Sequence, residues 1–274
     1  METSDKFIDL DEAIRKKNPR LLKIIPKFIF NYLKRILHQD GLNAIIVNAK
    51  GANGLAFIKS ALNDLGTTYE TFGVENIPKT GRFIFASNHP LGGLDGMVLM
   101  QAVGRVHPNL KFIVNDFLLN IKNLEDVFVP VNKVGRQNSE YFKKIEDLYQ
   151  SDEQVLNFPA GLCSRKIKGK ITDLPWQKSF ILKATKYKRD IIPVYFDALN
   201  TNFFYNLANL RKFIGIKFNV EMLYLVDEMY KQKNKPIRLI FGKPIPYETF
   251  DKSKTPVEWA NFVRQEVYAL PNKL

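Results

Sequence analysis

The chain has 274 residues, 45% of them hydrophobic, which is enough to bury a sizeable core and argues against a disordered chain. Its formal net charge of +13 favours anionic partners: nucleic acid, an anionic membrane or an acidic carrier protein. The single cysteine excludes an internal disulfide, and with only 3 histidines the chain has too few ligands for a Cys/His zinc cluster.

The chain starts with the acidic and polar residues Met1–Asp5, which do not resemble a signal peptide. No uninterrupted apolar run reaches the roughly 18 residues that a membrane-spanning helix needs. We therefore expect a cytoplasmic protein. Any contact with a membrane should be made at the membrane surface.

Residues 1–66 are predicted to form an N-terminal helical unit. It begins with a short helix over residues 9–17. One or two further helices are expected over residues 42–65, with a break at the glycines near residues 51–54.

The segment from Asn18 to Leu37 is predicted to be an amphipathic helix, because its apolar residues recur at helical spacing. Pro26 should kink or divide it. Eight basic residues and no acidic residue lie between Arg15 and Arg35. One interpretation is a helix that packs on its own domain with a solvated basic face. The other is a membrane-facing helix on anionic lipid, and the two can coexist.

Residues 67–274 are predicted to form an α/β domain with a mixed, mostly parallel sheet flanked by helices, because strand patterns alternate with helix patterns. Strands are expected over residues 69–74, 82–87, 110–115, 126–132, 154–158, 190–196 and 238–241, and helices over residues 139–150, 176–186 and 256–270. Pro130 indicates an edge strand or a strand end. The apolar but basic segment 203–226 is predicted to be either a core helix and strand or an interfacial patch near the mouth of the site.

The chemistry-bearing residues follow the strand over residues 82–87. His89 and Pro90 leave this strand, and Gly92-Gly93 allows a tight turn or the close approach of a ligand. Asp95 is a plausible N-cap for a helix that begins near Gly96. A histidine and an aspartate are thus expected on one strand-to-helix turn, at the end of the sheet where α/β proteins place chemistry.

Asn88-His89 and Asp95 resemble the first motif of the glycerolipid acyltransferase superfamily, the lysophosphatidate acyltransferase type, which reads Asn-His-x4-Asp. Here five residues separate His89 from Asp95, and Gly92-Gly93 is expected to absorb the extra residue as a bulge. The resemblance implies that His89 is the general base and that Asp95 holds its tautomer. Asp116, just after the next predicted strand, is the alternative partner.

The second family motif carries basic residues after a strand, and Lys133 and Arg136 stand where the family has arginines. The resemblance implies that one of them holds a phosphate or carboxylate of the acceptor; the alternative is a solvated basic loop. The third motif reads Phe-Pro-Glu-Gly-Thr-Arg-Ser, whereas this chain has Ala160 in place of the glutamate. This difference is consistent with a divergent bacterial branch that handles another lyso-lipid, such as an acylated amino acid. Arg165 is the candidate for an anionic headgroup.

The fourth motif, a strand with a central proline, is matched around Pro193, which is expected to line the acyl or acceptor channel. The candidate catalytic residues are therefore His89 and Asp95. The residues assigned to substrate binding are Asn88, Gly92, Gly93, Lys133, Arg136, Phe158, Pro159, Gly161, Arg165 and Pro193.

The resemblance implies an O-acyltransferase that moves a fatty acyl group from acyl carrier protein or coenzyme A to the hydroxyl of a lyso-lipid. It would act on the cytoplasmic face of the inner membrane as a peripheral protein, without metal, cofactor or nucleic acid. A non-catalytic basic module that binds membranes or nucleic acid is the alternative. A thiol enzyme built on Cys163 and His89 is possible by residue type, but the cysteine is more simply a small loop residue. Neither a Gly-x-Ser-x-Gly nor a phosphate-loop pattern occurs.

Overall fold

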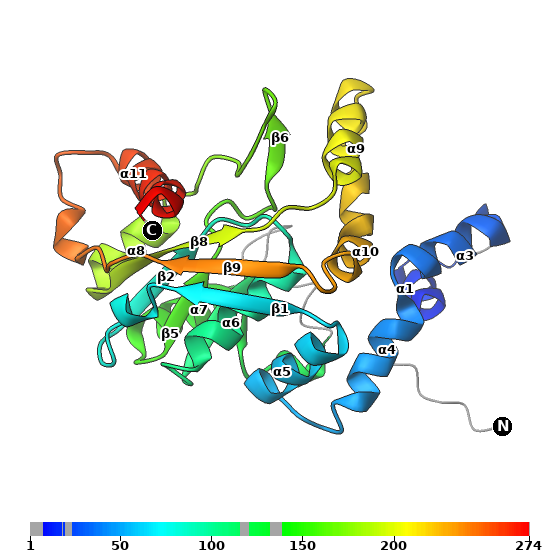
Figure 1. Ribbon diagram of the computed structural model, residues 1–274, viewed down its shortest axis with the longest axis horizontal. Coiled ribbons are helices and arrows are strands. Elements are labelled where there is room, and N and C mark those ends of the chain that lie inside the picture. The colour runs from blue at the N-terminus through cyan, green and yellow to red at the C-terminus, as the bar shows by residue number, and fades with distance from the viewer. Residues whose placement is uncertain (1–7, 18, 20–23, 116–120, 132–138, 274) are drawn as a thin grey trace.

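The computed structural model describes residues 8–17, 19, 24–115, 121–131 and 139–273. A twisted sheet lies at its centre with helices on both faces, and the N-terminal helices extend from one side (Figure 1). The strands of the main sheet are β1 (Thr68–Phe72), β2 (Phe83–Ser87), β3 (Leu110–Asn115), β4 (Phe128–Val131), β5 (Gln154–Asn157), β8 (Asp190–Asp197) and β9 (Pro236–Phe241). A separate hairpin consists of β6 (Arg165–Ile167) and β7 (Lys170–Thr172).

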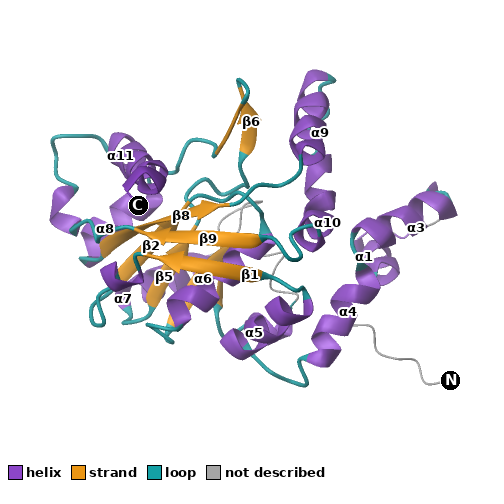
Figure 2. Ribbon diagram, in the orientation of Figure 1, coloured by secondary structure: helices purple, strands orange, loops and turns teal. Residues whose placement is uncertain are grey.

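Helices account for most of the remaining described chain (Figure 2). The α-helices are α1 (Leu10–Lys17), α3 (Lys27–Ile36), α4 (Gln39–Asn48), α5 (Gly54–Asp64), α6 (Gly93–Gly104), α7 (Ser139–Gln150), α8 (Ser179–Tyr187), α9 (Asn202–Phe213), α10 (Leu225–Tyr230) and α11 (Pro256–Ala269). Among the residues described, no helix combines the length and the apolar character needed to cross a bilayer.

Within the described chain, seven strands form the main sheet in the order β1-β9-β8-β2-β5-β3-β4. All neighbouring pairs run parallel except β8 and β9, which are antiparallel. This arrangement confirms the predicted mixed, mostly parallel sheet. β2 lies between β8 and β5, so the histidine that follows β2 leaves the middle of the sheet. Pro130 lies in the edge strand β4, as predicted, where a missing N–H leaves no ladder bond unmade.

The alternation of side chains along β2 divides the core into two layers. Phe83 and Phe85 pack with α5 and α6 on one face. Ile84 and Ala86 pack with α7, α8 and α11 on the other face. All five β2 residues are buried, as is typical of a central strand in a parallel sheet. The position of the turn that follows β2 is therefore fixed by the packing of the strand.

The N-terminal helices contact the rest of the described chain at several places, among them the core packing of α5 and the pairing of His38 with α10. α5 contributes Phe57 and Ile58 to the core layer that contains α6, so it packs as part of the α/β domain. His38, just before α4, stacks on Tyr230 of α10 with ring centroids 4.1 Å apart, and its Nε2 lies 2.9 Å from Asp227 Oδ1. The predicted domain division at residue 66 stays a prediction.

Most predicted elements occur within a few residues of their expected bounds. Pro26 divides the N-terminal helix as predicted, since it caps α3 in an extended conformation; residues 20–23 lie outside the described residues. The predicted break between two helices falls between α4 and α5.

Two expectations about the elements were wrong, and one element was not predicted. The helix expected from residue 176 begins only at Ser179, because the N–H of Gln177 is bonded to Pro159 O and Trp176 is buried beside the sheet. Segment 203–226 contains helices but no strand among its described residues. The β6–β7 hairpin was not predicted, because its two strands have three residues each.

Candidate active site

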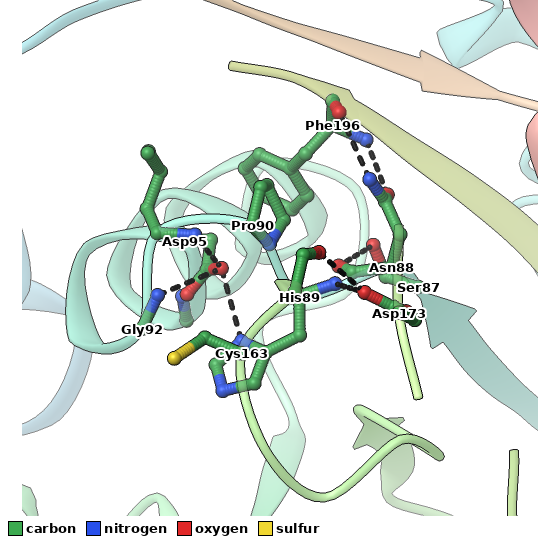
Figure 3. A network of polar contacts seen from close by, with 12 residues as sticks. Ser87, Asn88, His89, Pro90, Gly92, Asp95, Cys163, Asp173 and Phe196 are labelled. Carbon is green, nitrogen blue, oxygen red and sulfur yellow. Dashed lines mark hydrogen bonds and ion pairs between the residues drawn. The ribbon is translucent and has the colours of Figure 1, made fainter. Parts of the chain in front are cut away.

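The turn after β2 is fixed by the side chain of Asn88. Its Nδ2 donates to Phe196 O at 3.0 Å, and its Oδ1 accepts from Phe196 N at 2.7 Å. Both bonds reach β8, so the Asn88 side chain continues the pairing of β2 with β8 beyond the point where the β2 backbone leaves the sheet (Figure 3). Asn88 is buried and both ends of its amide are bonded to the chain itself, an arrangement that positions the next residue, His89.

His89 and Asp95 meet in the structure. The Nδ1 atom of His89 lies 2.9 Å from Asp95 Oδ2, and Asp95 is fully buried while 16% of the histidine side chain is exposed. An imidazole held this way turns its Nδ1–H toward the carboxylate and presents the Nε2 lone pair on its other side. Figure 3 shows that second nitrogen on the side of the ring away from Asp95.

The carboxylate of Asp95 is also fixed by the backbone. Its Oδ2 accepts from the N–H groups of Leu91 at 2.9 Å and Gly92 at 3.2 Å. These bonds hold a negative charge at the N-terminal turn of α6, where the helix dipole stabilises it. The predicted role of Asp95 as N-cap of a helix from Gly96 was wrong: α6 begins at Gly93, and Asp95 is its third residue.

The turn between His89 and Asp95 bends at Gly92, and the predicted absorption of the extra residue there stays a prediction. This glycine has φ 88° and ψ −119°, a conformation essentially restricted to glycine. A Cβ atom there would lie 3.0 Å from Leu225 at the start of α10. At Gly93 the φ angle is ordinary, and an added Cβ would meet no atom within 4 Å. The two glycines predicted as a pair thus have different roles: Gly92 makes the turn, and Gly93 is the exposed first residue of α6.

Asp173 is a central residue of the site that sequence reasoning missed. Its Oδ1 accepts from the backbone N–H of His89 at 3.2 Å and from Ser164 Oγ at 2.6 Å, while its Oδ2 accepts from Trp176 Nε1 at 2.9 Å. The N–H of Ser164 in turn donates to His89 O at 2.7 Å. Because Asp173 is buried, 84 residues from His89 and outside every recognised motif, only the fold reveals this contact.

Phe158 brings the third motif against the histidine. Its ring is stacked on the imidazole of His89, with centroids 4.0 Å apart and planes 17° apart. Gly161 makes the tight turn that follows, with φ 68° and its N–H bonded to Phe158 O, and Pro159 O accepts from Gln177 N. Among the described residues predicted for substrate binding, Phe158 is therefore the one that stacks on the His89 ring.

Arg165 is placed differently from the expectation that it binds a headgroup. It is 2% exposed, and its Nη2 lies 3.1 Å from Glu221 Oε1, while its Nη1 donates to Cys163 O. Glu221 also pairs with Arg211 of α9 at 2.8 Å. The guanidinium of Arg165 thus belongs to a buried ion-pair network that joins the third-motif loop to α9.

The other predicted positions give less information. Pro193 is buried in β8 opposite Ala86, and its carbonyl accepts from Gly242 N, so its predicted role in a channel stays a prediction. Lys133, Arg136 and the alternative partner Asp116 lie outside the described residues.

Cys163 and the remaining histidines take no part in the dyad. Burial raises the pKa of the Cys163 thiol to about 11, and its sulfur contacts Arg165 and Met222. His107 bonds to Pro78 O at the opposite end of β2, and His38 bonds to Asp227. Among the described residues, no group of three or more His, Cys, Asp or Glu side chains could hold a metal ion.

The chain is similar to known acyltransferases. The profile of the acyltransferase family matches residues 12–274. A lyso-glycine lipid O-acyltransferase of Bacteroides thetaiotaomicron is 48% identical over 265 residues, which cover 96% of this chain and 97% of the relative. A protein of the same name from Phocaeicola vulgatus is 44% identical, covering 96% and 95% of the two chains.

A solved structure was also found. The crystal structure of the 1-acyl-sn-glycerophosphate (LPA) acyltransferase PlsC from Thermotoga maritima is 19% identical, with a TM-score of 0.47 over 89% of each chain. From the family profile and the two relatives, the chain belongs to the acyltransferase family and is an O-acyltransferase.

Proposed function

We propose that the protein transfers a fatty acyl group from an acyl thioester to the hydroxyl of a lyso-lipid, with a lyso-glycine lipid as its acceptor. The observation that carries the proposal is the His89–Asp95 dyad at the end of the central strand, in a chain 48% identical to a lyso-glycine lipid O-acyltransferase. A non-catalytic basic binding module, the alternative function, would not require a buried carboxylate paired with a mostly buried imidazole.

The chemistry follows from the orientation of the imidazole. Nε2 of His89 takes the proton from the acceptor hydroxyl as its oxygen attacks the thioester carbonyl. The new C–O bond forms, the C–S bond breaks, and the imidazolium returns its proton to the leaving thiolate. Asp95 stabilises the transient imidazolium and keeps Nδ1–H in place. The ring of Phe158 fixes the imidazole plane and covers one of its faces.

The acceptor class is supported by the residue that replaces the family glutamate. Ala160 is buried and packs in the core layer with α8 and α11, so no carboxylate is present at that position of the third motif. A lyso-glycine lipid carries a carboxylate, which needs a positive partner. Lys133 and Arg136 remain the proposed partners, because Arg165 is already paired with Glu221.

The acyl donor in this proposal is acyl carrier protein or coenzyme A. Both carry the acyl group on a thiol and both are anionic, which suits a chain with a net charge of +13. The chemistry of the dyad is the same for the two donors. The choice between them therefore depends on the surface around the site and is decided by the assay below.

The proposal includes peripheral attachment at the cytoplasmic face of the membrane through the basic helix. Lys27 is exposed on α3, whereas Lys34 is paired with Asp11 of α1. Each Lys or Arg near an anionic surface contributes about 1 kcal/mol, and salt weakens the contribution. Vesicle sedimentation at low and high salt tests this, with Lys23, Lys27 and Lys34 changed to Gln. Binding that ignores both these changes and the anionic lipid content would rule out the attachment.

The activity itself is tested with purified protein, acyl-carrier-protein or coenzyme A thioesters, and a panel of lyso-lipids. We expect a diacylated glycine lipid by mass spectrometry with the lyso-glycine lipid, and little product with lysophosphatidate. The matched control is His89→Ala, which should keep the fold and form no product. If no lyso-lipid gains an acyl chain from either donor, the binding-module alternative becomes the better interpretation.

A further inference from the structure

Most large apolar side chains exposed by the described residues lie in two segments. Eleven of the sixteen belong either to residues 24–32, which include the start of α3, or to residues 199–218, which include α9. The second group is densest in residues 210–218, which we call the apolar tip. Its exposed apolar side chains are Leu210, Phe213, Ile214, Ile216 and Phe218. Phe213 is 88% exposed and Phe218 64%, and apolar exposure concentrated in this way marks an interaction surface.

The backbone of the apolar tip is held in place by hydrogen bonds. α9 ends in a turn in which Gly215 N donates to Lys212 O at 3.2 Å and Ile216 N to Arg211 O at 3.0 Å, with Gly215 at φ 76°. Beneath this turn, the buried Arg211 donates to Ile216 O at 2.9 Å and to Glu221 at 2.8 Å. The backbone of the tip is therefore tied to the interior while its apolar side chains remain outside.

The surroundings of the apolar tip are positively charged. Lys212 and Lys217 lie within it, and the sequence from Thr201 to Val220 contains no acidic residue. The β6–β7 hairpin rises beside α9 (Figure 1) and is joined to it by a 3.2 Å bond from Asn209 Nδ2 to Lys166 O. The hairpin adds the exposed Lys168 and Lys170, and residues 159–172 contain no acidic residue either. A surface that is both apolar and cationic is complementary to an anionic lipid bilayer.

The helix that leads to the apolar tip, α9, begins near α3, and Tyr224 contacts both helices. Tyr224 accepts or donates a 2.8 Å bond to the hydroxyl of Tyr32 of α3, and its ring packs edge-on against Phe203 of α9 at 5.0 Å. Both exposed groups thus meet at Tyr224. The surface also adjoins the candidate active site, because β6 begins directly after Ser164, whose N–H is bonded to His89 O.

We propose that the apolar tip inserts into the interfacial region of an anionic bilayer while the lysines of the tip and the hairpin contact lipid phosphates. The inference rests on the proposed function in one respect, that the acceptor is a membrane lipid. It adds a second bilayer-contacting element, distinct from the basic helix α3 and next to the loop that holds His89.

The first test is vesicle binding in the absence of an acyl donor. Phe213→Ser with Phe218→Ser should weaken binding to phosphatidylglycerol vesicles by about a hundredfold, because each buried phenylalanine contributes about tenfold or more. Phe142→Ser on α7, which removes another exposed phenylalanine, is the matched control and should bind normally. Lys212→Gln with Lys217→Gln should weaken binding by about thirtyfold at low salt and little at high salt. Lys243→Gln with Lys252→Gln is the charge-matched control.

The second test measures insertion directly. Trp176 and Trp259 are buried, so a tryptophan introduced as Phe213→Trp supplies a new, exposed fluorophore. Its fluorescence should be quenched by phospholipids brominated near the headgroup end of the acyl chain. Quenching no greater than in the native protein would overturn the proposal, as would equal vesicle affinity of the double serine variant and the native chain.

Two further measurements separate membrane insertion from dimer formation and from a failure of the proposed function. If sedimentation velocity shows that the native chain is a dimer and the double serine variant a monomer with unchanged vesicle affinity, the tip is an interface between copies and the proposal fails. The double serine variant should acylate acceptor dissolved in detergent at the native rate and lose activity on vesicles. If the native chain forms no product in detergent, the proposed function is contradicted. The vesicle-binding and quenching measurements would still test the insertion of the apolar tip, because they need no acyl transfer.

Discussion

The carboxylate of Asp173 holds the backbone of His89, with its Oδ1 atom 3.2 Å from the histidine N–H. The same oxygen accepts from Ser164 Oγ, so one buried carboxylate joins the first-motif turn to the third-motif loop. The imidazole is thus positioned twice: Asp95 holds the ring, and Asp173 holds the backbone that carries it.

We predict that Asp173→Asn lowers kcat at least about tenfold with little change in KM, because an amide cannot accept all three bonds, and destabilises the fold by about 2 kcal/mol. Trp176→Phe is the matched control, since it removes a bond to Oδ2, the oxygen that does not contact His89. It should keep kcat. Steady-state kinetics corrected for folded fraction decide the point. Equal loss of kcat in both variants would reduce Asp173 to a purely structural residue.

Changes at His89, Asp95 and Asp116 should lower turnover to different extents. His89→Ala should remove nearly all turnover without unfolding the chain, which circular dichroism checks. Asp95→Asn should lower kcat by orders of magnitude, since the loss for the corresponding change in a Ser-His-Asp protease is about 10⁴-fold. Asp116→Asn should have little effect. Near-normal turnover of Asp95→Asn would show that the family likeness extends to the fold but not to this chemistry.

The two glycines of the turn should respond differently to alanine. Gly92→Ala forces a side chain into φ 88° and against Leu225, so we expect a destabilisation of about 1–3 kcal/mol and a loss of activity as the Asp95 turn shifts. Gly93→Ala meets open space and should be close to neutral in both measurements. Chemical denaturation and the acyl-transfer assay measure the pair. A neutral Gly92→Ala would mean that the turn adapts and that its geometry does not set the dyad.

The network of Arg165, Glu221 and Arg211 should act as a structural clamp. Glu221→Leu leaves two buried guanidinium groups without their carboxylate, which costs about 3–5 kcal/mol. In a double-mutant cycle, Arg165→Met and Glu221→Leu should couple by about 2 kcal/mol. If Arg165→Met instead raises KM for the acceptor and leaves stability unchanged, Arg165 binds the headgroup after all.

The Cys163 thiol provides a prediction for pH. Burial raises its pKa from 9.0 to about 11, so the folded chain keeps the neutral thiol where the unfolded chain has already ionised. The stability that Cys163 contributes is therefore present below pH 9.0 and is lost as the pH rises toward about 11. The difference in unfolding free energy between the native chain and Cys163→Ala, measured across this range, should fall with pH. A thiol reagent at neutral pH should leave activity intact; rapid inactivation would revive the thiol-enzyme alternative.

The sequence alone determined the α/β class, the central buried strand and the presence of His89 and Asp95 on one turn. These features depend on local patterns: an apolar run, a Pro and Gly break, and a short spacing between two functional side chains. The division of the N-terminal helix at Pro26 and the edge position of Pro130 were predictable for the same reason, since proline acts on its own residue and its neighbours.

Tertiary structure decided the features that depend on residues far apart in the chain. Asp173 reaches His89 across 84 positions, and Arg165 meets Glu221 across 56, so neither partner leaves a local signal. Burial turned the predicted headgroup residue Arg165 into an internal ion pair, because a charge inside a protein is retained where another side chain neutralises it.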